Sequence, residues 1–174
     1  MVIIISTIPE NFDPQSGKSN YTRLTPGKHR LRVLGAAISG WEWWEDTPEG
    51  GRKPTRLREE ENPPVAHAED IKKFLAMPVW NYDQEKIQIL EVTQSTIQRE
   101  LKALDKDKDW GDLTEYDIEI ERTGNDKNTT KYRITPKPKS KLEASTQKAV
   151  ELGLPVLEAL FDGADPFTTV KGEE

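Results

Sequence analysis

The chain of 174 residues contains no cysteine and only two histidines, His29 and His67. The absence of cysteine excludes disulfide bonds, thiolate nucleophiles and every cysteine-based zinc site. The two histidines are far apart in the sequence, which argues against a histidine-rich metal site. We therefore expect neither a metal ion nor another cofactor.

Long apolar runs are absent as well. The run near the start, Val2 to Ile5, is four residues long and has no basic region before it. Such a run is too short for a membrane span or a secretory signal. Hydrophobic residues make up 34% of the chain and charged residues 32%, which indicates a strongly solvated surface. We expect a soluble, cytoplasmic protein with one domain and some appendages.

The motifs of common enzyme classes are also missing. The sequence has no Gly-rich phosphate loop, no GxSxG, no HExxH and no Cys–His pair. The acidic stretch that begins at Asp105 lacks the glycine and the closing glutamate of a calcium loop, where Trp110 and Tyr116 stand instead. We predict no catalytic residues. A metal-dependent nuclease is kept as an alternative, because its carboxylates can come together from distant strands.

Charge is distributed unevenly along the chain. The formal net charge of −6 argues at first against a nucleic-acid partner, because phosphate contacts need lysine and arginine. However, residues 18–58 hold nine basic and four acidic side chains, whereas residues 142–174 hold two basic and seven acidic ones. The basic N-terminal part and the acidic C-terminal part of the chain favour binding of a polyanion by the N-terminal part.

Apolar periodicity predicts a mainly β fold with five strands and one helix between the third and fourth. The expected strands are 29–38, 74–82, 86–93, 116–122 and 130–135. Thr93 or Ser95 is expected to cap the helix, and Pro136 and Pro138 to end the last strand. Residues 45–70 are expected to form a long polar loop. This order is that of the OB-fold, a five-stranded Greek-key barrel, and a two-layer α+β sheet is the alternative.

The same patterns divide the chain into four parts. We expect an N-terminal extension over 1–22, the OB-fold domain over 23–140, a C-terminal helical segment over 141–161 and an acidic flexible tail over 162–174. The helical segment is predicted to break at Gly153 and Pro155.

Three of the five tryptophans, Trp41, Trp43 and Trp44, lie within four residues. Flat rings stack on nucleic-acid bases of any sequence, and each stacked base contributes roughly 1–3 kcal/mol. Strand alternation separates Trp44 from the other two rings, so at least one of the three is expected in the core. Trp80 and Tyr82 form a second aromatic pair, as a stacking platform or as part of the core. The basic candidates beside these aromatic residues are Arg30, Arg32, Arg52, Lys53, Arg56, Arg58, Lys72 and Lys73.

Three stretches of sequence carry a resemblance to a known family. The stretches are VWNYDQEKIQILEVTQSTIQRELKAL, DWGDLTEYDIEIERTG and TKYRITPKP, preceded by GWEWW and RKPTRLRE. Together they resemble phage-encoded single-stranded DNA-binding proteins with one OB-fold. The resemblance implies a set of residues on or near the DNA groove: Trp41, Trp43, Trp44, Arg56, Arg58, Trp80 and Asn81.

The end of the chain is similar to the acidic, phenylalanine-containing tails of that family, which recruit replication partners. The similar segment is LFDGADPF, residues 160–167. It implies a partner-binding role for Asp162, Asp165, Pro166 and Phe167. Two features depart from the family: residues 168–174 follow the phenylalanine, and the zinc-binding cysteines of some relatives are absent.

The sequence therefore predicts sequence-independent binding of single-stranded DNA in phage DNA replication, recombination or repair. The expected partners are single-stranded DNA and, through the tail, replication or recombination proteins in the host cytoplasm, without a membrane and with self-association left open. An OB-fold adaptor that binds proteins and no nucleic acid is the alternative favoured by the net acidity.

Overall fold

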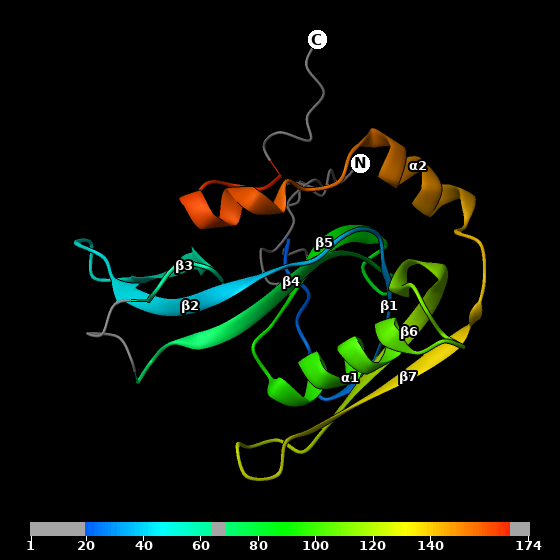
Figure 1. Cartoon of the computed structure of the whole chain (residues 1–174), viewed down its shortest axis with the longest axis horizontal. Coiled ribbons are helices and arrows are strands. Elements are labelled where there is room, and N and C mark those ends of the chain that lie inside the picture. The colour runs from blue at the N-terminus through cyan, green and yellow to red at the C-terminus, as the bar shows by residue number, and fades with distance from the viewer. Residues whose placement is uncertain (1–19, 64–68, 168–174) are drawn as a thin grey trace, which may run out of the picture.

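A computed structural model describes residues 20–63 and 69–167. The strands are β1 (Gly27–Val33), β2 (Ile38–Asp46), β3 (Arg52–Arg58), β4 (Lys72–Asn81), β5 (Lys86–Val92), β6 (Tyr116–Thr123) and β7 (Lys131–Lys139). The helices are α1 (Ser95–Lys106) and α2 (Ala144–Leu152), and two 3-10 turns are η2 (Leu113–Glu115) and η3 (Leu157–Asp162) (Figure 1). None of the described helices is long and apolar enough to cross a membrane.

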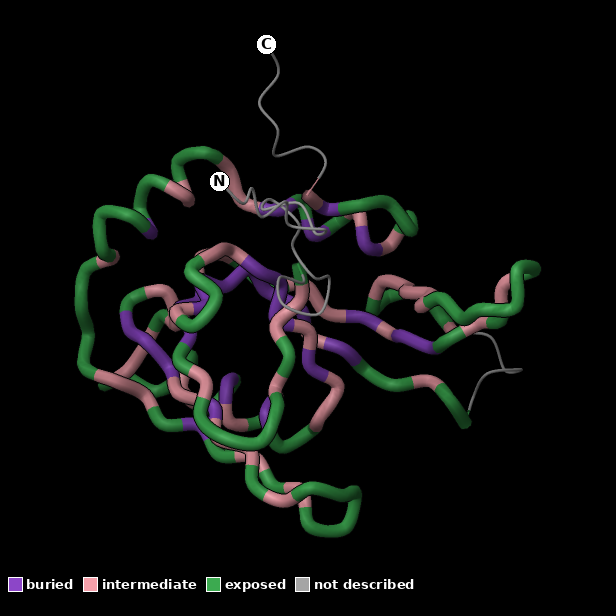
Figure 2. Tube along the Cα trace, turned by 180° about the vertical axis from the view of Figure 1, so that it is seen from behind, coloured by how far each residue is buried: buried purple, intermediate pink, exposed green. Residues whose placement is uncertain are grey.

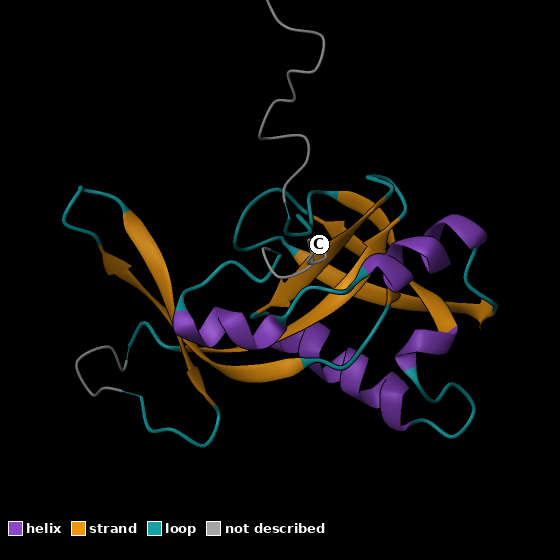
Figure 3. Ribbon diagram, turned by 90° about the horizontal axis from the view of Figure 1, so that it is seen from above, coloured by secondary structure: helices purple, strands orange, loops and turns teal. Residues whose placement is uncertain are grey.

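The seven strands form one antiparallel sheet in which β4 is the central strand. One edge of β4 pairs first with β2 and then with β1, and its other edge pairs with β5. The path of the sheet is β3-β2-β4-β1-β6-β7, with β5 joined to β4. The sheet curves (Figure 3) but stays open, since no pairing among the described residues joins β5 to β7. The mainly β architecture is confirmed, whereas the expected closed barrel is not observed.

Two strands differ from the sequence prediction. The expected strand 29–38 is two strands, because β1 ends at Val33 and β2 begins at Ile38. The expected loop over 45–70 is wrong over Arg52–Arg58, which is β3 and pairs with β2 along its whole length. Its side chains are mostly polar, so no apolar alternation marks it. Backbone pairing and cross-strand ion pairs hold this strand instead.

Helix capping and proline also differ from the prediction. The N-cap of α1 is Gln94, without a side-chain cap, rather than Thr93 or Ser95. Pro136 and Pro138 do not end β7, which continues to Lys139. Because β7 is an edge strand, a missing N–H there costs no ladder hydrogen bond. The predicted strands in 74–82, 86–93 and 116–122 and the helical break at 153–155 are confirmed.

Two clusters of buried side chains lie on opposite faces of β4, because alternate residues of a strand point to opposite faces. The larger cluster contains Leu31, Val33, Met77, Val79, Leu90, Val92, Ile97, Leu101, Tyr116, Ile118, Ile120 and Ile134. The smaller contains Phe74, Ala76, Ile89, Leu157 and Leu160. Figure 2 shows the buried residues concentrated in the middle of the sheet, while the turn between β2 and β3 is exposed.

The C-terminal segment 157–167 packs against the face of the sheet that carries the smaller cluster. The N–H of Val156 donates to the carbonyl of Pro166 at 2.9 Å, and Phe167 packs against the cluster. The prediction of a flexible tail is therefore wrong for residues 162–167. Residues 168–174 of the expected tail and residues 1–19 of the expected N-terminal extension lie outside the described residues.

Gly40 is required where β2, β3 and the C-terminal segment meet. A Cβ atom at this position would lie 2.1 Å from the backbone oxygen of Leu57 and 3.1 Å from the rings of Phe74 and Phe161. We expect Gly40→Ala to lower the free energy of unfolding, measured in urea, by about 1–3 kcal/mol. The control is Gly51→Ala, whose added Cβ would meet only a hydroxyl at 3.4 Å. Equal stability of the two variants would contradict this close packing.

Candidate nucleic-acid interface

Arg32, a candidate for phosphate binding, is buried with 1% of its surface exposed. Its Nε donates to the carboxylate of Asp117 at 2.7 Å. Its other nitrogens donate to the backbone oxygens of Thr114 and Ser140 and to the Ser140 hydroxyl. The guanidinium thus holds β1 to β6 and to the segment after β7. In this arrangement the Arg32 guanidinium has almost no surface open to a phosphate.

Arg30 and Tyr82 converge on the same carboxylate. The guanidinium of Arg30 lies 2.9 Å from Asp117 and 5.7 Å from the centre of the Tyr82 ring. The Tyr82 hydroxyl donates to Asp117 at 2.7 Å, and burial, with this hydrogen bond, raises the pKa of Tyr82 to about 12. These two candidates belong to a polar cluster that links β1, β4 and β6. The Arg30 side chain is about half exposed, so it alone of this cluster faces solvent broadly.

Trp80 and Asn81 are buried at the end of β4. The amide nitrogen of Asn81 donates to Gln88 at 2.8 Å, and its oxygen accepts the N–H of Asp83 at 3.0 Å. Asn81 therefore shapes the turn between β4 and β5. Both side chains are buried and offer almost no surface to a base in this arrangement.

The three clustered tryptophans have three different environments on the β2–β3 hairpin (Ile38–Arg58), which projects from the rest of the sheet (Figures 1 and 3). Trp43 is 3% exposed, and its indole N–H donates to Glu45 at 2.9 Å. Trp44 is 48% exposed. Trp41 is half-buried, and the Lys73 ammonium lies 5.7 Å from its ring centre. Trp41 and Trp44 therefore keep exposed surface, whereas Trp43, which shares a strand face with Trp41, is buried, so strand alternation alone does not predict which rings are exposed.

Basic residues surround these rings on both faces of the hairpin. The register pairs Arg52 with Asp46 and Lys53 with Glu45 on β2, and it pairs Lys72 and Lys73 of β4 with Glu42 and Trp41. Strand alternation then places Trp41, Lys53 and Lys73 on one face and Trp44, Arg52 and Lys72 on the other. The Arg52 side chain is 61% exposed, and Lys73 forms an ion pair with Glu59.

Arg56 lies between two carboxylates rather than in solvent. Its Nε is 3.1 Å from Glu42, and its terminal nitrogen donates to Glu91 at 2.7 Å. Glu42 is itself 6% exposed. Burial, and the hydrogen bond and charge of Glu91, raise the pKa of Glu42 to about 8 against the opposing effect of Arg56. This cluster joins β2, β3 and β5 and is structural.

Arg58 is engaged by the C-terminal segment. Its guanidinium lies 4.7 Å from the centre of the Phe161 ring and 3.3 Å from the Glu158 carboxylate. The tail candidates Asp162 and Asp165 are exposed, whereas Pro166 is buried and Phe167 is half-buried. The contacts of Arg58 thus come from the predicted helical segment 141–161, directly before the predicted tail.

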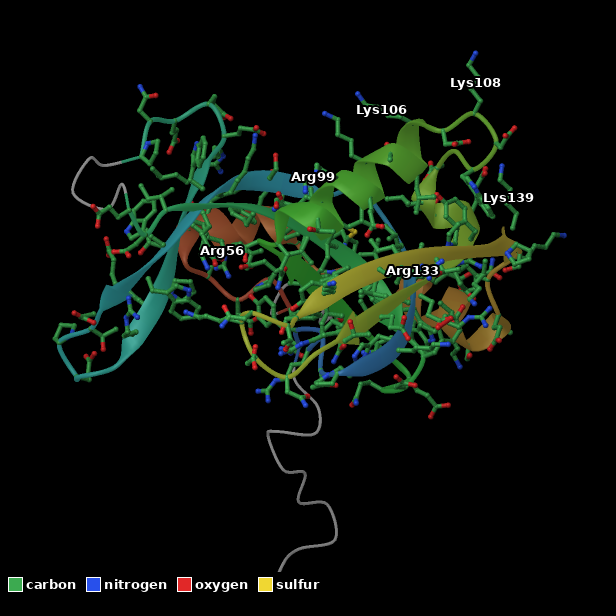
Figure 4. All side chains as sticks on the ribbon, turned by 90° about the horizontal axis from the view of Figure 1, so that it is seen from below. Arg56, Arg99, Lys106, Lys108, Arg133 and Lys139 are labelled. Atoms are coloured by element: carbon green, nitrogen blue, oxygen red, sulfur yellow. The ribbon has the colours of Figure 1, made fainter. Side chains whose placement is uncertain are left out.

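Two basic residues of α1 are missed by reasoning from the sequence. Arg99 and Lys102 are exposed residues of α1 and line a cleft between this helix and the sheet; Figure 4 shows Arg99 on α1. Their i, i+3 spacing places them on one helix face, but only the packing of α1 shows that this face borders the tryptophan hairpin.

Comparison with protein-family models, curated proteins and solved structures found no match. Within 20–63 and 69–167, no group of three or more acidic or histidine side chains could hold a metal ion.

The carboxylate cluster around Arg56 makes stability depend on pH. In the unfolded chain Glu42 loses its proton near its ordinary pKa of 4.5, but in the folded chain it keeps the proton up to about pH 8. The folded state therefore binds more protons between these values, and stability falls as pH rises, by up to about 1.4 kcal/mol per pH unit. Urea unfolding across this range measures the slope.

Glu42→Gln tests the origin of this slope. Glutamine mimics the protonated acid and does not titrate, so we expect the variant to lose the pH dependence and to match or exceed the wild type near pH 8. Glu60→Gln, at an exposed position, is the control and should keep the slope. An unchanged slope in Glu42→Gln would show that Glu42 is ionised throughout this range.

Proposed function

We propose that the protein binds single-stranded DNA without sequence preference and without catalysis. The observation that carries the proposal is Trp44, a large ring about half exposed on a projecting hairpin. Arg52 lies beside it and donates to the Trp44 backbone oxygen at 3.3 Å. An exposed tryptophan next to exposed cations is the arrangement that stacks bases and neutralises phosphates.

The strand pairing supports an interpretation of the sheet as an OB-fold topology that is not closed into a barrel. Taken without β2 and β3, the strands pair β1–β4, β4–β5, β1–β6 and β6–β7, with α1 between β5 and β6. An OB-fold has these four pairings and a fifth that closes the barrel. On this interpretation the β2–β3 hairpin is the loop between the first two barrel strands, one of the loops with which OB-folds bind oligonucleotides. The resemblance to phage single-stranded DNA-binding proteins agrees with this assignment.

Trp44→Ala tests the proposal directly. We expect it to weaken binding of a labelled thymine oligomer, measured by fluorescence anisotropy, by about 1–3 kcal/mol, the contribution of one stacked base. Trp110→Phe is the control, since Trp110 packs against Tyr116 with ring centres 5.4 Å apart. Wild-type binding should also weaken with added salt.

A protein–protein adaptor is the second candidate, because an exposed tryptophan is also a common anchor of protein interfaces and the net charge is −6. The same titration separates the two functions. Absence of salt-dependent binding by the wild type would remove the DNA-binding proposal and leave the adaptor.

The C-terminal segment is expected to compete with DNA at low salt. Because Phe161 covers Arg58, Phe161→Ala should loosen this segment, free the Arg58 guanidinium and tighten binding of the thymine oligomer at low salt more than at high salt. Leu152→Ala, at a position 71% exposed, is the control. Unchanged affinity in a folded Phe161→Ala variant would contradict self-competition. Deletion from Asp162 is a poorer test, because it also removes Pro166 and Phe167 from the smaller core.

A further inference from the structure

A half-open cleft of about 820 Å³ lies between α1 and the neighbouring parts of β2 and β4. Its floor is apolar: Leu75 and Leu113 are half-buried and keep some exposed surface, whereas Met77 and Leu101 are buried. The side chains of Ala36 and Ala37 at its border are small. The volume falls in the range of about 300–1,000 Å³ that is typical of sites for small organic groups.

The two ends of the cleft carry opposite charge. Gln98 of α1 donates to the backbone oxygen of Lys73 at 2.9 Å, so the first half of α1 lies beside the start of β4. Arg99, which follows Gln98, therefore borders the end that contains Lys73, and Lys102 lies one turn further along α1, near enough to Glu59 for its charge to lower the pKa of that carboxyl. Asp105 and Asp112 line the other end, where Asp112 caps η2 by accepting from the N–H of Thr114 at 2.9 Å.

The basic end adjoins the half-buried tryptophan of the hairpin. The Lys73 ammonium lies both in the lining of the cleft and 5.7 Å from the centre of the Trp41 ring. The Trp41 indole donates to the backbone oxygen of Glu59 at 3.3 Å. The Glu59 carboxylate, which also lines the cleft, forms an ion pair with Lys73 and accepts a hydrogen bond from the hydroxyl of Ser39. No ion pair of Arg99 or Lys102 is found within the described ranges.

We infer that the basic half of this cleft binds one or two nucleotides of the strand that stacks on Trp41. Their bases lie on the apolar floor, and their phosphates lie at Arg99 and Lys102. The inference rests on the proposed function and extends it from the hairpin to α1. The complementarity is that of a nucleotide, since an apolar surface for the base ends in cations for the phosphate. Because Asp105 and Asp112 repel the phosphates, the strand leaves the cleft away from its acidic half.

The test is a salt series with the full-length Arg99→Ala, Lys102→Ala double variant and a thymine oligomer. For single strands each lost phosphate contact lowers the slope of log affinity against log salt by about 0.7, so we expect a loss of about 1.4. The control is Lys141→Ala, Lys148→Ala, which removes the same charge from exposed positions outside the cleft. Its slope should equal that of the wild type.

Photocrosslinking of the wild-type chain to a 5-iodouracil oligomer is an independent readout that needs no variant. We expect crosslinks at Trp41 and within residues 95–106. Binding by the wild type with an unchanged slope in the Arg99 and Lys102 variant, or crosslinks confined to the hairpin turn, would overturn the inference and leave the proposed function intact. Absence of any wild-type binding would overturn both.

Discussion

The burial of β4 on both faces is the constraint on which the rest of the structure depends. Its side chains alternate between the two cores, with Met77 and Val79 in one and Phe74 and Ala76 in the other. A strand of this kind needs a cover on each side. The curved sheet and α1 cover one face, and the segment 157–167 covers the other. The first half of β4 also pairs with β2. The β2–β3 hairpin and its tryptophans therefore extend from the part of the sheet that is covered on both faces.

Cross-strand register explains why a locally basic stretch is not a basic surface. Arg32 lies opposite Asp117, and Arg56 lies opposite Glu42, and opposite charges at such positions stabilise the pair. The excess of basic residues in 18–58 is thus partly neutralised by acids from the same hairpin and from β5 and β6. Counting charge along the chain overlooks partners that only strand pairing brings together. It also overlooks Arg99 and Lys102, which lie outside the counted stretch.

Sequence periodicity predicts the elements whose apolar residues alternate, and it fails where other forces hold the strand. β6 is predictable because Tyr116, Ile118 and Ile120 mark its inner face. β3 is not, since Leu57 is its one large aliphatic side chain and its ion pairs are invisible in a linear pattern. The sequence pattern also does not predict which of the tryptophans is buried. Trp43 and Trp44 are adjacent, yet one is buried and the other exposed, because burial depends on what packs over each face of the hairpin.

Two of the three arginines of β3, Arg56 and Arg58, differ in how readily a nucleic acid could contact them. Arg58 is 40% exposed and lies against the Phe161 ring, a contact that resembles the stacking of arginine on a base. Arg56 is hydrogen-bonded to Glu91 and to Glu42, which keeps its proton up to about pH 8, and removing one partner of a largely buried ion pair typically costs about 3–5 kcal/mol. A phosphate that drew Arg56 away would leave Glu91 without this partner. Displacement of the C-terminal segment by DNA, as the proposed self-competition requires, would therefore free Arg58 further, while Arg56 would stay paired within the fold.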